Sequence, residues 1–159
     1  MKIRKLKPKD RASLKALLWA QEHFKPEEIR VALELIDIVL DNPDQEDYIV
    51  RCAEGTEGEI LGYICYGRAP LTDAVYDLYW IVVHPASWNQ GMGSSLLRQA
   101  EGDMVRRGAR LVLIETSSTP PYEGPRAFYR KHGYQEQARI LDYYSRGDHK
   151  LILGKTLAP

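Results

Sequence analysis

The sequence is poor in cysteine and contains no long apolar run. Its 159 residues include only two cysteines, Cys52 and Cys65, which provide neither a disulfide framework nor a set of metal ligands. Both lie in apolar, strand-like segments, so we expect buried, reduced and inert thiols, and we predict no metal site. No apolar stretch approaches the roughly 20 residues of a membrane-spanning helix. The charged N-terminus lacks the apolar segment of a secretory signal, so we expect a cytoplasmic protein without a membrane partner.

The sequence also lacks a net charge. Its 22 lysines and arginines equal its 22 aspartates and glutamates, whereas nucleic-acid-binding proteins usually carry a basic surplus. The exception is a group of cations near the N-terminus: Lys2, Arg4, Lys5, Lys7, Lys9 and Arg11. We interpret this group as the solvated face of an edge strand and a helix start. We therefore predict no nucleic-acid partner.

The residues that are present are typical of a folded protein. Hydrophobic residues make up 44% of the chain and charged residues 28%, which excludes a disordered protein. A length of 159 residues is enough for one substantial core. The sequence contains no internal repeat, linker or low-complexity segment. We therefore predict a single domain over residues 1–159.

Apolar spacing and turn signals predict four helices and seven strands. The helices are expected from Pro8 onward, over Pro26–Leu40, over Met92–Val105 and over Arg126–His132. The strands are expected over Met1–Leu6, Tyr48–Ala53, Glu59–Tyr66, Val75–Val83, Arg110–Thr116, Gln135–Asp142 and His149–Thr156. The last two strands flank a hairpin turn at residues 145–148.

This order of elements predicts an α+β fold. We expect a mixed, mostly antiparallel seven-stranded sheet flanked by about four helices. Residues 75–116 form a strand–helix–strand unit, which should be a right-handed crossover between two parallel strands. The continuous apolar run Leu111–Ile114 predicts that the second of these strands is buried on both faces.

The stretch His84–Leu97 joins the end of a strand to the start of a helix through two glycines, Gly91 and Gly93. The first amides of a helix have no acceptor within the helix, and the helix dipole adds positive charge there. Glycines let an anion approach such a backbone closely. The spacing excludes a Walker P-loop and the dinucleotide pattern G-x-G-x-x-G. On its own the stretch is either a tight turn or a phosphate site.

Two motifs together resemble the GNAT N-acetyltransferases. Val82-Val83-His84-Pro85, followed by the two glycines that open a helix, is similar to motif A of this family, whose loop binds the pyrophosphate of coenzyme A. Arg126 to Tyr134, with the sequence RAFYRKHGY, is similar to motif B. Their spacing and the order of strands around them also match, so the resemblance covers essentially the whole chain. It implies the GNAT fold and acetyl-CoA as cosubstrate.

The resemblance implies a set of residues that bind acetyl-CoA. Backbone groups near Ile81–Val83, where the family has a bulge, would polarise the acetyl carbonyl. The sequence departs from the family at Trp88, where arginine or glutamine is usual, and at Tyr122 and Pro125, where asparagine and alanine are common. Gln90 could contact a phosphate in place of the missing arginine. The predicted residues are Ile81, Val82, Val83, Trp88, Asn89, Gln90, Gly91, Met92, Gly93, Ser94, Ser95 and Tyr122.

Acetylation of an amine requires proton transfer at two places. The departing thiolate must gain a proton, and the resemblance implies Tyr129 as its donor. The alternative is that Tyr129 is a core aromatic beside Phe128.

The amine must lose a proton, and two carboxylates are candidates. Asp77 lies within an apolar strand, on the same face as Tyr79 by alternation, and a buried strand does not accept an aspartate without compensation. Glu115 lies at the end of the next parallel strand, where open sheets place ligands. A water relay is the third possibility.

The leading hypothesis is an acetyl-CoA-dependent N-acetyltransferase that transfers the acetyl group directly to an amine of a small molecule or peptide in a ternary complex. One alternative is a catalytically silent coenzyme A sensor or structural homologue, and another is a nucleotide-binding regulatory domain. A homodimer is possible. Aromatic residues that could form the acceptor wall, the core or a dimer contact are Trp19, His23, Phe24, Tyr143 and Tyr144.

Overall fold

Helices and strands follow one another in the predicted order. The computed structural model of the protein describes residues 1–157, so the last two residues of the predicted domain lie outside the described residues. The strands are β1 (Lys2–Lys5), β2 (Ile49–Glu54), β3 (Ile60–Arg68), β4 (Val75–Val83), β5 (Leu111–Ser117), β6 (Gln135–Ser145) and β7 (Asp148–Thr156). The helices are α1 (Arg11–Trp19), α2 (Pro26–Asp41), α3 (Met92–Arg106) and α4 (Glu123–Lys131), with short 3-10 turns at Pro8–Asp10, Pro85–Ser87 and Pro120–Tyr122.

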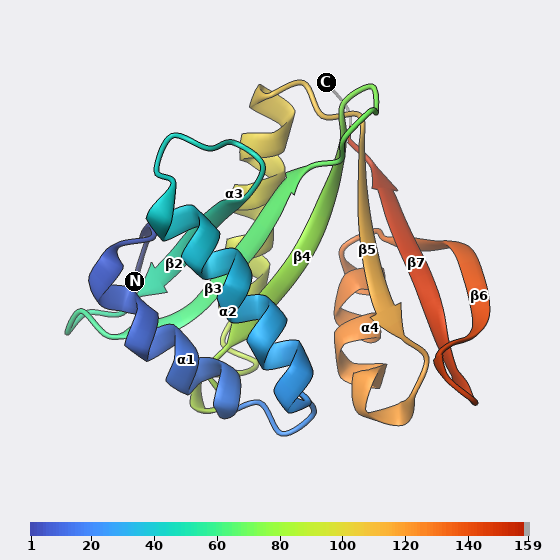
Figure 1. The fold of residues 1–159 in the computed structure, drawn as a ribbon, viewed down its shortest axis with the longest axis horizontal. Helices are drawn as coiled ribbons and strands as arrows, with labels where there is room; N and C mark the ends of the chain where they lie inside the picture. The colour runs from blue at the N-terminus through green and yellow to red at the C-terminus, as the bar shows by residue number, and fades with distance from the viewer. Residues whose placement is uncertain (158–159) are drawn as a thin grey trace. The chain divides into compact units, whose positions relative to one another are not determined.

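The strands have the order β1-β2-β3-β4-β5-β7-β6 (Figure 1). Strands β4 and β5 pair in parallel, as the strand–helix–strand unit predicts. The pairs β1–β2, β2–β3, β5–β7 and β6–β7 are antiparallel. The predicted fold class, a mixed and mostly antiparallel seven-stranded sheet with four helices, is therefore confirmed.

The described chain falls into two compact units that share strand β4. One consists of Met1–Gly67 with Tyr79–Asp103, and the other of Arg68–Leu78 with the chain from Met104 onward. No helix in residues 1–157 combines the length and the apolar character needed to cross a membrane. Each unit is described in turn below.

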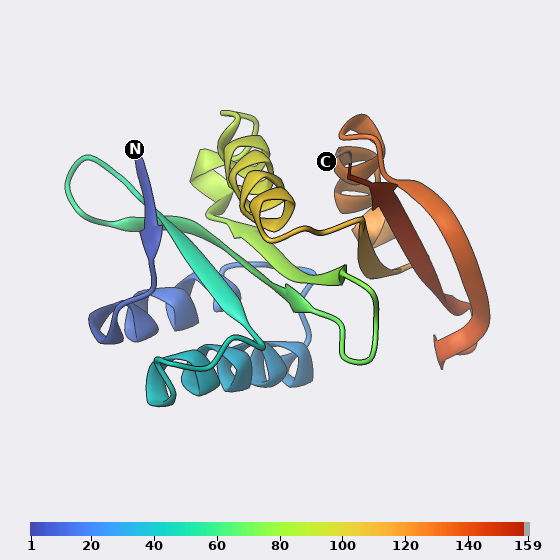
Figure 2. The same ribbon diagram turned by 90° about the horizontal axis from the view of Figure 1, so that it is seen from above.

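In the first unit, helices α1 and α2 cover one face of β1–β3 and helix α3 covers the other (Figure 2). Helix α2 begins where the sequence predicts it. Pro26 occupies its first turn, where the missing amide has no cost, and the Glu28 carboxylate accepts a hydrogen bond from the Lys25 amide at 2.7 Å. Leu14, Leu17, Leu18, Ile29, Ala32 and Ile36 bury their side chains against Val50, Cys52, Tyr63, Cys65 and Val82 of the strands.

Strand β4 does not keep a strict alternation of faces. Tyr79 and Trp80 are consecutive, yet both pack against the core that α1 and α2 form. The Tyr79 ring lies 5.4 Å from Tyr48, and the Trp80 ring lies 5.4 Å from Phe24. Such a break is characteristic of a bulge, and it lies just before the Ile81–Val83 segment where the resemblance implies one. This break lies after Tyr79, so the shared face of Asp77 and Tyr79 stays a prediction.

In the second unit, helix α4 lies along one face of the β5–β7–β6 strands (Figure 2). Val112 and Ile114 of β5 are buried, whereas Leu111 and Leu113 are half-buried and Glu115 is exposed. The expectation that this apolar run is buried on both faces is therefore wrong. The strand is covered on one face, and its other face retains contact with solvent.

Two elements of the second unit differ from their predicted bounds. Helix α4 starts at Glu123 instead of Arg126, because Pro125 falls in the first turn, where proline is tolerated. Strand β6 continues to Ser145 instead of Asp142. Its register is irregular between Ile140 and Ser145, and Asp142 has a φ of 54°, so the strand resumes after a local distortion.

Both cysteines are buried free thiols, as predicted. Burial raises the pKa of each to about 12, so neither is a reactive thiolate at neutral pH. Tyr63 lies opposite Cys52 in the β2–β3 register. Its side chain is fully buried, and its hydroxyl has no hydrogen-bond partner within the part of the chain that the structure describes. An unsatisfied buried hydroxyl destabilises the folded state.

We expect Tyr63→Phe to stabilise the protein by about 1 kcal/mol, because the substitution removes an unpaired polar group and leaves the ring. Tyr66→Phe is the matched control. Tyr66 is equally buried on the same strand, but its hydroxyl donates to Asp103 Oδ2 at 2.7 Å. This second variant should lose about 1–2 kcal/mol. Urea unfolding of both variants measures the two differences, and a destabilised Tyr63→Phe would show that the hydroxyl has a partner in solution.

Candidate active site

The loop between β4 and α3 is held by a series of local hydrogen bonds. The His84 amide donates to the Leu61 carbonyl at 2.8 Å, which ties the end of β4 to β3. The His84 carbonyl accepts from the Ser87 amide, and His84 Nδ1 accepts from the Ala86 amide at 3.2 Å. This short 3-10 turn directs the chain into the glycine stretch. The loop therefore has a defined path before the helix begins.

Two residues of the loop adopt left-handed backbone conformations. Asn89 has a φ of 60° and Gly91 a φ of 78°. Asparagine and glycine are the residues that tolerate this region best. A Cβ built on Gly91 would meet no atom within 4 Å, so the space in front of this backbone is open. Gly91 is therefore required for conformation, and its open side leaves room for a ligand.

Helix α3 begins directly after Gly91. Its first intrahelical hydrogen bond runs from the Ser95 amide to the Gly91 carbonyl at 3.0 Å. The amides of Met92 and Gly93 precede this bond and have no acceptor within the helix. Together with the helix dipole they form a backbone site suited to a phosphate group. The residues present therefore fit the pyrophosphate of coenzyme A.

Trp88 and Gln90 use their side chains within the loop itself. The Trp88 indole Nε1 donates to the Val83 carbonyl at 2.9 Å, and the ring is about half exposed. The side-chain Nε2 of Gln90 donates to the Ala86 carbonyl at 3.1 Å. Trp88 thus fastens the loop to the end of β4, a role that differs from the phosphate contact of an arginine. Gln90 also bonds to the loop in this structure.

Tyr129 lies on α4 in the second unit. It is 8% exposed, and its ring packs edge-on against Phe128 and Tyr134, at 5.4 and 5.8 Å between ring centres. Burial raises the pKa of Tyr129, so the phenol keeps its proton throughout the neutral range. Its hydroxyl makes no hydrogen bond to another residue of the described chain. The group is therefore a buried, protonated phenol.

The segment between β5 and α4 is fixed by a buried arginine. Arg126 is 5% exposed and donates to the carbonyls of Ser117 and Thr119, at 2.7 and 2.9 Å, and to the Glu123 carboxylate at 2.8 Å. Tyr122 lies directly before α4, at the end of this segment, and its side chain makes no capping hydrogen bond. Arg126 was part of the predicted motif B, but the sequence did not indicate that its side chain is a buried anchor.

The two candidate bases lie in the second unit and differ in their surroundings. Asp77 is half-buried, and burial is the largest cause of its raised pKa, followed by the charge of Glu115. Glu115 is exposed and forms an ion pair with Lys150 Nζ at 2.9 Å. Lys150 was not predicted as a site residue. Its contact depends on the β5–β7 register, which the sequence does not reveal.

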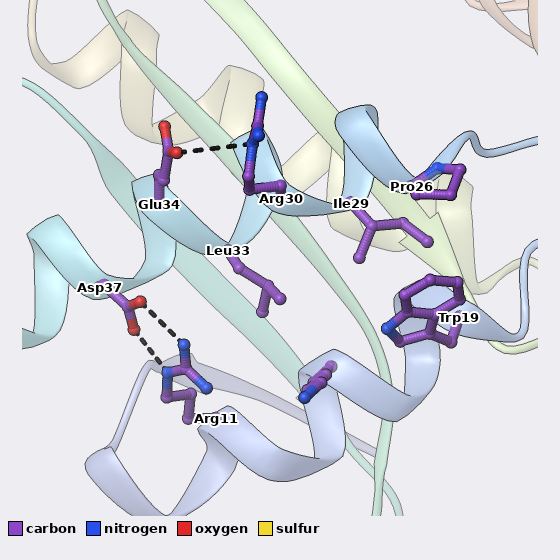
Figure 3. Close-up of a pocket in the computed structure, with 9 residues that line it drawn as sticks. Arg11, Trp19, Pro26, Ile29, Arg30, Leu33, Glu34 and Asp37 are labelled. Carbon is purple, nitrogen blue, oxygen red and sulfur yellow. Dashed lines mark hydrogen bonds and ion pairs between the residues drawn. The ribbon is translucent and has the colours of Figure 1, made fainter.

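A shallow groove of about 260 Å³ lies elsewhere, between α1 and α2 (Figure 3). Trp19 stands at one end, and Leu33 forms part of the floor. Arg11 and Asp37 form a two-bonded ion pair across it, at 2.6 and 2.9 Å. None of the predicted acetyl-CoA or catalytic residues lines this groove. Of the five aromatic residues considered for an acceptor wall, it contains Trp19 alone.

Comparisons with known proteins identify the family. A family model described as an acetyltransferase (GNAT) domain matches residues 44–136, which include both motifs. A GNAT-family protein of known structure from Desulfovibrio desulfuricans is 34% identical, with a TM-score of 0.94 and 99% of each chain covered. The chain belongs to the GNAT acetyltransferase family. The resemblance of the two motifs to this family is therefore confirmed.

More distant solved GNAT structures share the fold. The ribosomal-protein-S18-alanine N-acetyltransferase from Escherichia coli is 16% identical, with a TM-score of 0.78 and coverage of 99% of this chain and 94% of that one. An aminoglycoside 6′-N-acetyltransferase complexed with coenzyme A is 20% identical, with a TM-score of 0.77 and coverage of 100% and 98%. A sequence search of curated proteins finds no significant match.

The structure groups the predicted GNAT site residues in two sets. The loop residues 88–95 and the end of β4 at Ile81–Val83 belong to the first unit. Asp77, Glu115, Tyr122 and Tyr129 belong to the second. Within the second unit, the charge of Glu115 is close enough to Asp77 to raise the pKa of that carboxyl, after the larger effect of burial. No group of three metal-binding side chains occurs within residues 1–157.

We expect Gly91→Asp to abolish measurable coenzyme A binding. A carboxylate about 4 Å from a phosphate costs about 4 kcal/mol near a protein surface, so the dissociation constant should rise more than about a hundredfold. Gly108→Asp is the matched control. Gly108 has a similar φ of 83°, also has open space, and follows the opposite end of α3. Isothermal titration calorimetry on both folded variants makes the comparison. Equal affinities in the two variants would exclude the loop as the pyrophosphate site.

Proposed function

We propose that this protein is an acetyl-CoA-dependent N-acetyltransferase that transfers the acetyl group directly to an amine in a ternary complex. The observation that carries the proposal is the open backbone site at the start of α3. Gly91 leaves space there, and the first amides of α3 have no acceptor within the helix. Membership of the GNAT family supports acetyl-CoA as the ligand. In this proposal residues 88–95, the Ile81–Val83 backbone and Tyr122 contact acetyl-CoA.

Tyr129 is proposed as the acid that protonates the departing thiolate. Its raised pKa keeps the hydroxyl protonated, and its hydroxyl is not engaged by another described residue. The ring contacts with Phe128 and Tyr134 fix its position. Proton transfer from a positioned side chain typically contributes about 10²–10⁴ in rate. A water relay remains the alternative to a side-chain base for the amine step.

The acceptor in this proposal is an amine of a small molecule or a peptide. Relatives with the same fold include enzymes named for a ribosomal protein's alanine and for aminoglycosides, so amines of both kinds belong in a test. The proposal also includes one acetyltransferase domain over residues 1–159, a cytoplasmic location and possible homodimerisation. The match of the Desulfovibrio structure over 99% of each chain supports the single domain.

The test of the proposed function is acetylation of an amine panel with mass-spectrometric detection. The panel contains polyamines, aminoglycosides, free amino acids and peptides with different N-terminal residues. An acetylated product that depends on acetyl-CoA and disappears in Gly91→Asp supports the enzyme. Tight coenzyme A binding without any product, over the whole panel, would favour the silent sensor. The feature that favours the silent sensor is Trp88, which stands where the family usually has arginine or glutamine.

We expect Tyr129→Phe to lower kcat by about 10²–10⁴-fold with little change in acetyl-CoA affinity. Only a hydroxyl is removed, and the ring contacts remain. Tyr134→Phe is the control, because Tyr134 is also buried and touches the Tyr129 ring. It should keep kcat within a few-fold of the unsubstituted protein. Steady-state kinetics with the identified acceptor make the comparison. Full turnover in Tyr129→Phe would assign this tyrosine to packing alone.

A further inference from the structure

The uncovered face of the β5–β7 strands holds a group of charged side chains. Asp77 on β4 is in register with Leu113 on β5, and Ser117 on β5 is in register with Lys150 on β7. Side chains two residues apart along a strand share a face. Glu115 lies midway between Leu113 and Ser117 on β5 and therefore shares its face with both Asp77 and Lys150. Three strands thus contribute one charged group each to a single surface.

Lys150 is held firmly in this group. Its Nζ lies 2.9 Å from Glu115 Oε2 and 4.4 Å from the centre of the Tyr143 ring. The lysine side chain is only 12% exposed, whereas that of Glu115 is 55% exposed. Burial alone would lower the pKa of Lys150, but the hydrogen bond and charge of Glu115 raise it above its ordinary value. The ammonium group therefore stays charged and paired.

Asp77 differs from Glu115 in having no partner. Its carboxylate makes no hydrogen bond or ion pair with any residue among 1–157. The groups that act on it are Glu115 from β5, which raises its pKa, and Lys150 from β7, which lowers it less. Tyr144 from β6 faces the same charges. Burial is the largest cause of its raised pKa, and the charges of Glu115 and Asp148 add to it. A half-buried carboxylate with open lone pairs is suited to accept a proton.

We propose that Lys150 is a positioning residue for acetyl transfer, which holds Glu115 in an ion pair and leaves Asp77 as the proton acceptor. The inference rests on the proposed acetyltransferase function and decides between its two candidate bases. The ammonium form of the acceptor gives one proton to the Asp77 carboxylate. The neutral amine then forms the N–C bond as the C–S bond breaks. Tyr129 protonates the departing thiolate, and its phenolate regains a proton from the surplus proton on the new amide nitrogen. Asp77 releases its proton to solvent.

The electrostatic part can be measured without turnover. Carboxyl carbon NMR follows the titration of Asp77 in the unsubstituted protein, Lys150→Met, Glu115→Gln and the double variant. Because Glu115 raises the pKa of Asp77 by more than Lys150 lowers it, the midpoint should be highest in Lys150→Met. The unsubstituted protein, the double variant and Glu115→Gln should follow in descending order. A midpoint that does not move in Lys150→Met or in Glu115→Gln would overturn the proposal.

Lys155→Met is the control for removing a cation from β7. Lys155 is five residues from Lys150, so it lies on the other face of the strand, and its Nζ is near the Tyr134 ring. It should leave the Asp77 midpoint unchanged. If Lys150→Met fails to fold by circular dichroism, Glu115→Gln alone still tests the coupling, because it removes the same ion pair and should lower the midpoint.

Kinetics then assign the base. Asp77→Asn should lower kcat about 10²-fold or more, whereas Glu115→Gln should move the acid limb of the pH–rate profile to lower pH. Loss of turnover in Glu115→Gln with full activity in Asp77→Asn would overturn the inference. Absence of product in the unsubstituted protein over the whole amine panel is a different result. It would contradict the proposed function, while the NMR order would still report on the Lys150–Glu115 pair.

Discussion

Strand β4 has to satisfy two different sets of neighbours within nine residues. Its first three residues, Val75–Asp77, form the parallel ladder with β5. Further along the strand, Tyr79, Trp80 and Val82 pack against the core under α1 and α2. The break in alternation at Tyr79 and Trp80 lets the strand do both. Every group of the proposed site is on this strand or on an element that follows it in the chain.

The end of β4 also determines how the loop begins. The His84 amide and the Val83 carbonyl are both engaged, the first by Leu61 and the second by the Trp88 indole. The loop thus reaches Gly91 with its path fixed. The open side of that glycine gives access to the first amides of α3, which have no acceptor within the helix and provide positive potential without a basic side chain. In the proposed function, these amides take the place of the family's usual arginine or glutamine, which is tryptophan here.

Much of the fold could be predicted from the sequence because its signals are local. Pro26 with Glu27 and Glu28 marks the start of α2, and the glycine stretch marks the start of α3. The Leu111–Ile114 run predicts burial on both faces and the structure differs, since an apolar strand gives no indication of whether both of its faces are covered. The start of α4 was placed too late, because Pro125 was compatible with a loop as well as with a first helical turn.

Only those parts of the proposed site that have local sequence signals could be predicted. The loop residues and Tyr129 lie in contiguous motifs, so their candidacy is visible in the sequence. Lys150 is 35 positions beyond Glu115 in the sequence, and the ion pair exists only through the β5–β7 register. Arg126 likewise became recognisable as an anchor only when its contacts with Ser117 and Thr119 were seen. Contacts between distant residues need the folded chain.

The central claim is that backbone amides at the start of α3 hold the pyrophosphate of acetyl-CoA. The direct measurement is a titration followed by backbone amide NMR, with acetyl-CoA in one series and acetyl-pantetheine, which lacks the pyrophosphate and nucleotide, in the other. The account predicts that the amides of residues 89–95 shift strongly with acetyl-CoA and stay nearly unchanged with acetyl-pantetheine. Saturable binding of acetyl-CoA that leaves these amides unshifted would contradict it.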